Sequence, residues 1–180
     1  MPNSETKPIT LLFDLETTPL DAARTEIHCL VILDYETGET ARYNDTGAGE
    51  PILTGVKDLM YADTIIGHNI IGFDIPVLQE CYPFFEPQGR IVDTLLLSRL
   101  YHPDMLEIDR KRKVEGMPTK LYGRHSLESY GHRLGEYKGN FGETSDWSAW
   151  SKEMEDYCEQ DTIVTRKLCQ HFHPYLIGSN

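Results

Sequence analysis

The chain has 180 residues and a formal net charge of −12, with 39% hydrophobic and 26% charged residues. This length fits a single domain over residues 1–180, and the apolar content excludes a disordered chain. No apolar stretch is long enough to cross a bilayer, and residues 1–8, which we expect to be flexible, lack the apolar region of a signal peptide. The four scattered cysteines form no CxxC pair, which argues against a zinc site or disulfide framework and indicates a cytoplasmic protein.

The first hundred residues predict an alternation of strands and helices. Apolar runs bounded by turn residues indicate strands, and proline at a first turn indicates the start of a helix. The predicted elements, in chain order, are a buried strand at 9–16, strands at 29–33 and 41–43 joined by a Glu-Thr-Gly-Glu turn, a helix opened by Pro51, a strand at 64–67, a helix from about Asp74, a strand at 91–92 and a helix at 94–101.

The pattern breaks at residues 102–124, where prolines, charges and glycine predict an excursion loop from the core rather than a second domain. A helix is expected at Ser126–Leu134, closed by Gly135, and a last helix from about 148 to 172. This order of elements predicts an α/β fold with at least one antiparallel hairpin.

The acidic net charge lowers the expectation of nucleic-acid binding, because neutralising phosphates usually requires a basic face. Two exceptions exist: acidic clusters neutralised by divalent cations, and basic residues gathered locally. The run Arg110–Lys113, followed by Lys120 and Arg124, is such a local gathering. This basic run is consistent either with a solvated loop or with a contact to nucleic acid.

Two acids end the first predicted strand. Residues two apart in a strand share a face, so Leu12, Asp14 and Glu16 would lie together. Two carboxylates aimed at one point lose hydration and repel each other, which indicates either a functional site or a strand emerging into solvent.

The last predicted helix carries a third acid on an otherwise apolar or aromatic stripe, which should meet the sheet. The stripe consists of Tyr157, Asp161, Val164 and Leu168. No basic residue lies on it within a turn, so Asp161 needs either a distant basic partner or a divalent cation, which prefers carboxylate oxygens. Asp74, between a predicted strand and helix, is consistent with a helix N-cap, a metal ligand or both.

Three segments together resemble the motifs of the DEDDy superfamily of DnaQ-like 3′→5′ exonucleases. The family pattern is DxE on a strand, a second aspartate after an Asn-containing turn, and Tyr-x3-Asp on a helix. The matching segments are Asp14–Pro19, Asn69–Asp74 and Tyr157–Asp161. Residues 93–100 and 123–138 further resemble the proofreading domain of family A DNA polymerases of short-tailed phages. The resemblance covers about 9 to 172.

This resemblance implies a ribonuclease H-like α/β fold, with a mixed five-stranded sheet flanked by helices on both sides and the first strand in the centre. It also implies a two-metal exonuclease, using Mg²⁺ or Mn²⁺, that cleaves single-stranded or frayed DNA from the 3′ end. The catalytic residues it implies are Asp14, Glu16, Asp74, Tyr157 and Asp161, the four acids holding the metal ions and the tyrosine orienting the nucleophile. By the same resemblance Thr17 would contact the 3′-terminal nucleotide, Leu20 would wedge against the last bases and Asn69 would support the substrate.

The resemblance covers only the exonuclease domain, whereas family A polymerases continue into thumb, palm and fingers domains. We therefore expect either a free-standing, monomeric exonuclease or a subunit beside a separate DNA polymerase. We expect the protein in the cytoplasm, or in the host cytoplasm if it is phage-encoded. A 3′→5′ exoribonuclease or oligoribonuclease and a non-catalytic accessory subunit of a DNA polymerase are the alternatives. Asp93 is expected to cap a helix, and His68 and His125 to be structural or surface residues.

Overall fold

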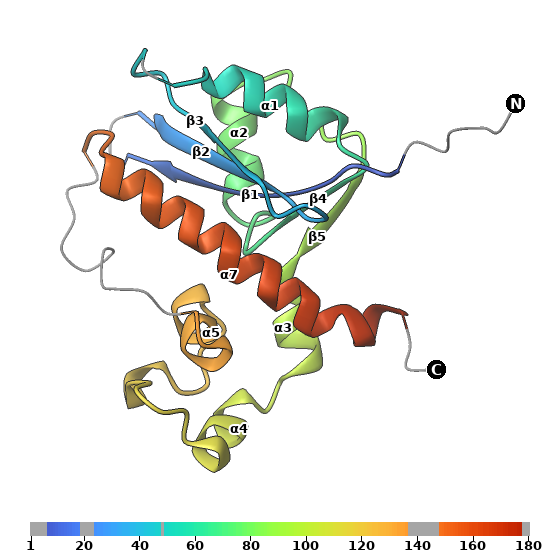
Figure 1. Ribbon diagram of the computed structural model, residues 1–180, viewed down its shortest axis with the longest axis vertical. Coiled ribbons are helices and arrows are strands. Elements are labelled where there is room, and N and C mark those ends of the chain that lie inside the picture. The colour runs from blue at the N-terminus through green and yellow to red at the C-terminus, as the bar shows by residue number, and fades with distance from the viewer. Residues whose placement is uncertain (1–6, 19–23, 48, 137–147, 178–180) are drawn as a thin grey trace, which may run out of the picture.

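The sheet of this protein has five strands in the order β3-β2-β1-β4-β5, with β1 in the centre (Figure 1). The computed structural model describes residues 7–18, 24–47, 49–136 and 148–177. β1 pairs antiparallel with β2 and parallel with β4, which makes the sheet mixed. The strands are β1 (Thr10–Thr17), β2 (Ile27–Asp34), β3 (Thr40–Tyr43), β4 (Thr64–Gly67) and β5 (Arg90–Asp93).

Helices cover both faces of the sheet. In Figure 1, α1 and α2 lie on one face and α7 crosses the other, with α3 and α5 packed against α7. The helices are α1 (Ile52–Tyr61), α2 (Asp74–Cys81), α3 (Thr94–Tyr101), α4 (Met105–Arg112), the 3₁₀ helix η1 (Thr119–Leu121), α5 (Leu127–Leu134) and α7 (Lys152–Ile177). This arrangement confirms the predicted fold class. No helix in the described part of the chain is both long and apolar enough to span a bilayer.

The alternation of side chains along β1 separates two cores. Phe13 and Leu15 are buried in the core beneath α1 and α2. Leu12 points to the opposite face and packs in a cluster that includes Cys169 of α7. Because residues two apart share a face, the β1 side chains that follow Leu12 on the α7 side are the acids of the DxE motif.

Helix α7 is buried on two sides, which corrects part of the sequence interpretation. Cys158 packs against β2, as expected for a residue facing the sheet. Val164 and Leu168 pack instead in a second cluster with Met105 of α4 and Tyr130 of α5. The predicted apolar stripe therefore faces the smaller helices for much of its length, because α7 lies between them and the sheet.

Residues 102–124, predicted as an excursion loop, contain α4 and η1. Met105 anchors α4, being 3% exposed. The buried Asp109 carboxylate accepts hydrogen bonds from Arg133 at 2.9 and 2.7 Å and from the Gly123 amide at 2.8 Å. α4 was not predicted because few of its residues are apolar. Its last turn contains the basic run ending at Arg112, and cations at this end of a helix stabilise it.

The remaining boundaries differ from prediction mainly in α7. This helix begins at Lys152, not near 148, after Ser151, whose hydroxyl accepts from the Met154 amide at 3.1 Å. It continues past Pro174 to Ile177. α5 is as predicted: Ser126 caps its start, and Gly135 ends it in the left-handed conformation (φ 73°).

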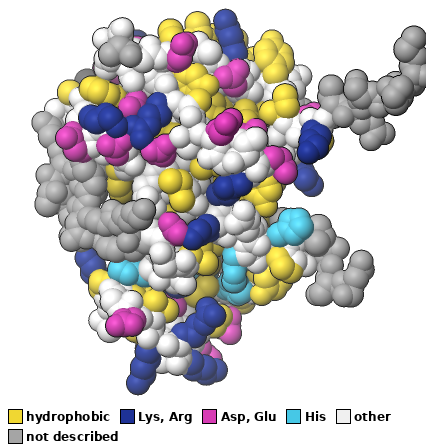
Figure 2. Space-filling model, in the orientation of Figure 1, with side chains coloured by type: hydrophobic (Ala, Val, Ile, Leu, Met, Phe, Trp, Pro, Cys, Tyr) yellow, Lys and Arg dark blue, Asp and Glu magenta, His cyan; other side chains and the backbone are white. Residues whose placement is uncertain are grey.

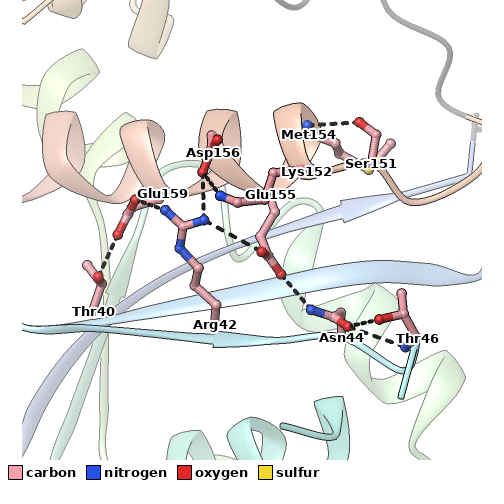
Figure 3. A network of polar contacts seen from close by, with 10 residues as sticks. All are labelled: Thr40, Arg42, Asn44, Thr46, Ser151, Lys152, Met154, Glu155, Asp156 and Glu159. Carbon is pink, nitrogen blue, oxygen red and sulfur yellow. Dashed lines mark hydrogen bonds and ion pairs between the residues drawn. The ribbon is translucent and has the colours of Figure 1, made fainter. Parts of the chain in front are cut away.

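A polar network fixes the first half of α7 to the edge strand β3 (Figure 3). Arg42 of β3 forms ion pairs with Asp156 at 2.6 Å, with Glu155 at 3.6 Å and with Glu159. The Asn44 amide donates to Glu155 at 2.8 Å. These contacts orient α7 as it crosses the sheet, and with it the residues of the Tyr-x3-Asp motif.

Candidate active site

A cleft of about 780 Å³ opens at the carboxyl ends of β1 and β4. Its walls come from the ends of these strands, from α2, α3 and α7, and from the segment leading into α5. The residues singled out from the sequence that line it are Asp14, Glu16, Asn69, Asp74, Tyr157 and Asp161. Segments far apart in the chain thus bring all five predicted catalytic residues to one cavity.

β1 supplies two acids from its last residues. Asp14 and Glu16 are half-buried on the face toward α7. The pairing of β1 with β2 shifts register between Glu16 and Thr17, an irregularity of the kind that redirects side chains near active sites. Thr17 itself is 8% exposed, and its hydroxyl donates to the Thr18 carbonyl. Thr17 is not among the described residues lining the cleft.

Asp74 lies in the first turn of α2 and is 3% exposed. The N-cap position belongs to Phe73, so the interpretation of Asp74 as the helix cap was wrong. The carboxylate instead interacts with the backbone amides of Asp74 and Leu15, and the latter contact brings it beside β1.

The turn that carries Asn69 is organised by Asp93. The Asp93 carboxylate accepts from the amides of Asn69 at 2.9 Å and Ile71 at 3.1 Å. It also accepts from the Leu95 amide at 2.9 Å, which confirms its predicted role as the cap of α3. This fixed turn holds Asn69 in the left-handed conformation (φ 68°), which asparagine tolerates better than most residues.

α7 supplies the remaining two residues, one helical turn apart. The Tyr157 phenol and the Asp161 carboxylate lie close enough to shift each other's pKa, that of the phenol upward and that of the carboxyl group downward. The neighbouring Cys158 thiol donates to the carbonyl oxygen of Asp14 at 3.2 Å, which joins α7 directly to β1. Sequence reasoning did not assign Cys158 to the site, although Met154 and Cys158 have the spacing of one helix face.

Burial raises the pKa of all four acids, and repulsion from other acids of the cluster adds to the shifts of Asp14 and Glu16. Burial, followed by repulsion from Asp161 and other groups, raises the pKa of Glu16 to about 9. Burial raises the pKa values of Asp74 and Asp161 to about 7, and burial with repulsion from Glu16 holds the pKa of Asp14 well above its usual value. Within the described residues, no Lys or Arg forms an ion pair with any of the four. The cluster therefore favours a positive charge that the described side chains do not supply.

The donor atoms of the cluster fit a hard cation. Ligand atoms of Asp14, Glu16 and Cys158 lie within 4.8 Å of one another. Burial raises the pKa of the Cys158 thiol well above its usual value, so the thiol keeps its proton. It donates this proton in a hydrogen bond to the Asp14 carbonyl oxygen. That leaves carboxylate oxygens as the available ligands, and these are what Mg²⁺ and Mn²⁺ prefer.

The opposite wall of the cleft is basic and carries two histidines. It includes Arg99 of α3, together with Arg124 and His125 from the segment before α5. His68 also lines the cleft, and its Nδ1 lies 2.9 Å from the Thr94 hydroxyl, while burial lowers its pKa to about 4. The histidines thus have the structural contacts expected of them but also face the cleft. Arg99 gave no signal in the sequence, since it stands alone on an amphipathic helix.

A sequence match shows which protein family has this fold and cleft. Residues 4–177 match the 3′-5′ exonuclease family model. The chain belongs to the 3′-5′ exonuclease family. It is a nuclease domain of DnaQ-like type, as the motifs predicted, and members of this family use divalent metal ions.

Two phage proteins show the same relationship. The exonuclease chain is 31% identical to the DNA-directed DNA polymerase of Escherichia phage T7 and 32% identical to that of Enterobacteria phage T3, each over 182 residues. These matches cover 89% of this chain and 26% of each polymerase, so the chain spans about a quarter of the length of these relatives. The predicted resemblance to a phage proofreading domain is confirmed.

Solved structures confirm the ribonuclease H-like fold of the exonuclease. NrnC of Brucella melitensis aligns with a TM-score of 0.65 and 20% identity, over 99% of this chain and 80% of NrnC. The EXO domain of Nibbler from Aedes aegypti aligns with a TM-score of 0.60 and 15% identity, over 95% of this chain and 84% of that one. Leu20, which the family pattern places against the substrate, lies outside the described residues.

Proposed function

We propose that this exonuclease removes nucleotides from the 3′ end of single-stranded or frayed DNA by a two-metal mechanism. The observation that carries the proposal is the convergence of four acids in one cleft, with raised pKa values and no basic partner among the described residues. The residues that would hold two Mg²⁺ or Mn²⁺ ions are Asp14, Glu16, Asp74 and Asp161.

When bound, such a pair of cations would lower the pKa of an attacking water and neutralise charge on the attacking and leaving oxygens. The acids supply the binding: their oxygens lie on three separate elements, so they can surround a cation from more than one side. NrnC, which shares the fold, has a solved structure with bound Mg²⁺, which supports this choice of cation.

Tyr157 would act as a neutral hydrogen-bonding group. Burial, followed by repulsion from Asp161, raises the pKa of its phenol, so the hydroxyl keeps its proton at physiological pH. Tyr157 and Asp161 both line the cleft, one helical turn apart on α7. With the carboxylate engaged by a cation, the same hydroxyl is placed to orient the attacking water, which requires donors and acceptors within hydrogen-bond reach.

Binding of the substrate end would use the residues around the acids. Asn69, held at the cleft by the Asp93 turn, would support the terminal nucleotide. The family pattern adds contacts from Thr17 and Leu20, of which Thr17 is buried beside the cleft's acids. Contacts of this kind are tolerant of sequence, which suits an enzyme that must accept any frayed end.

DNA is the favoured substrate because the phage relatives of 31% and 32% identity are DNA polymerases. A second candidate is an exonuclease acting on RNA or short oligoribonucleotides, and the likeness to NrnC, one structure of which holds pGG, favours it. A non-catalytic accessory role has less support, since every residue of the catalytic pattern is present and lines one cleft.

The setting we propose is a monomer in the cytoplasm, working alone or beside a separate DNA polymerase subunit. The polymerase context is supported by the phage relatives, three quarters of whose length lies outside the match. All four cysteines are free thiols, which fits a reducing compartment.

A single assay tests reaction, substrate and direction. Purified protein is incubated with Mg²⁺ and 5′-labelled single-stranded DNA, mismatched duplex DNA or RNA of the same sequence. We expect a ladder of labelled products shortening from the 3′ end, faster on DNA than on RNA, and none with EDTA. Degradation of RNA alone would select the second candidate, and no cleavage with Mg²⁺ or Mn²⁺ would select the accessory role.

A further inference from the structure

Residues 99–133, which contain α4, η1 and most of α5, differ in charge from the rest of the chain. We call them the basic lobe. They hold eight Lys and Arg against five Asp and Glu, a net charge of +3, whereas the other residues hold nine against 24, a net of −15. In a chain with a net charge of −12, this lobe is where a polyanion meets the least repulsion.

The basic lobe begins at the cleft and extends away from it. Arg99 and Arg124 line the cleft, and α4 lies at the far end of the lobe, beyond α5 (Figure 1). Figure 2 shows Lys and Arg side chains gathered at that end of the molecule. Arg110, Lys111 and Lys113 are exposed there. In the described part of the chain none of these three forms an ion pair.

At the surface of the lobe four exposed acids, Asp104, Glu107, Glu115 and Glu128, offset part of this charge, but seven exposed Lys and Arg outnumber them. Asp109 is 1% exposed and is neutralised internally by Arg133. Cations in the last turn of α4 also stabilise that helix through its dipole. Helix stability alone therefore explains the presence of one or two of these basic residues. Arg99 has the same explanation in the last turn of α3, whereas Arg124 lies outside any helix; both extend the positive charge to the cleft.

We propose that the basic lobe binds the phosphate backbone of the substrate strand on the 5′ side of the bond being cleaved. A strand whose 3′ end lies at the acids would cross Arg99 and Arg124 and reach Arg110, Lys111 and Lys113 on α4. This inference rests on the proposed function, because it assigns the direction of the strand. Contacts of cations with phosphates carry no base preference, and their strength falls with salt as bound counterions are released.

The length of the substrate should determine which of these contacts form. A dinucleotide occupies the cleft alone, so it cannot reach α4. A longer strand covers the lobe and gains phosphate contacts. Affinity should therefore rise with strand length until α4 is covered, and only the long strand should respond to changes on α4.

The test compares two triple variants of equal charge change in the full chain. The lobe variant carries Arg110→Gln, Lys111→Gln and Lys113→Gln. The control variant carries Lys7→Gln, Lys57→Gln and Arg90→Gln. These residues are exposed, lie before β1, on α1 and at the start of β5, and do not line the cleft. Binding of a fluorescein-labelled thymidine 20-mer is measured by anisotropy in EDTA, where metal-dependent turnover is prevented. Cleavage of the 20-mer and of the dinucleotide pTpT is then measured with Mg²⁺, and circular dichroism checks the fold of each variant.

We expect the lobe variant to bind the 20-mer about tenfold more weakly than the parent at about 0.1 M salt, and its slope of log Kd against log salt to fall by about 2. Its cleavage of pTpT should stay within about twofold of the parent, and the control variant should match the parent on both substrates. Equal binding of the 20-mer by lobe variant and parent would overturn the inference, as would equal weakening in the control variant. A parent that binds the 20-mer through the lobe but cleaves neither substrate would refute the proposed function and leave the lobe assignment supported.

Discussion

Replacing Asp74 by Asn should stabilise the cation-free protein, and the gain should grow as the pH rises from about 4 to about 7. Asp74 is 3% exposed, and its pKa is raised from 3.8 to about 7, chiefly by burial. The folded protein therefore binds this proton more tightly than the unfolded chain does. Its contribution to stability is most favourable below the unfolded pKa and is lost as the pH rises through the folded pKa.

The size of the effect follows from the shift. A change of about 3 pKa units corresponds to about 4 kcal/mol, at about 1.36 kcal/mol per unit. The four acids share the cost of confinement, so we expect about half of it, about 2 kcal/mol, to be recovered by one substitution. For a domain of this length that is about 6 °C in Tm.

Urea unfolding in EDTA, followed by circular dichroism at several pH values, measures this gain. Glu80→Gln is the matched control, because Glu80 lies on the same helix and is exposed. Its stability difference from the parent should be small at every pH. A gain in Asp74→Asn that does not depend on pH, or a loss of stability at about pH 8, would refute the electrostatic account. Adding Mg²⁺ at about pH 8 should stabilise the parent more than Asp74→Asn, since the variant lacks one carboxylate.

Three further tests address the site and its support. Changing Asp14 and Glu16 together to Ala should abolish cleavage while the fold survives with equal or higher Tm, because repulsion is relieved; a parental rate would refute the site. Tyr157→Phe should lower kcat about 100-fold with KM within about twofold in steady-state assays, and an unchanged kcat would remove the hydroxyl from the mechanism. Arg133→Met should cost about 3–5 kcal/mol in urea unfolding by leaving the Asp109 carboxylate buried without its partner, and Asp109→Leu in the same chain should recover part of that loss.

The fold was predictable because its signals are local or follow simple periods. The first strand is apolar from Leu11 to Phe13 and again at Leu15, as expected for a central strand that is largely buried on both faces. The proline before α1 and the Ser126 and Gly135 caps of α5 marked helix ends correctly. α4 was missed for the opposite reason: only Met105 and Asp109 of its residues are buried, so no apolar period is visible.

The site was predictable in part. Strand alternation alone placed Asp14 and Glu16 on one face. The absence of a basic residue near Asp161 on its helix stripe indicated that this acid needs a distant basic partner or a cation, without any knowledge of the fold. Asp74 was assigned to the site only through the family pattern, because an acid in the first turn of a helix is otherwise common. The cleft wall containing Arg99 could not be predicted, because its position depends on how α3 and α5 pack against α7, which local sequence does not encode.

The joining of β1 and α7 has a consequence for the synthesis of this enzyme. Asp14 emerges from the ribosome early, whereas Asp161 and the helix that docks it emerge only after the whole sheet has been made. The carboxylates on the nascent strand face an empty flank until α7 covers them. With the site we propose, a partly translated chain has no assembled nuclease centre, and we expect cleavage of nucleic acids only after the last helix has folded onto the first strand.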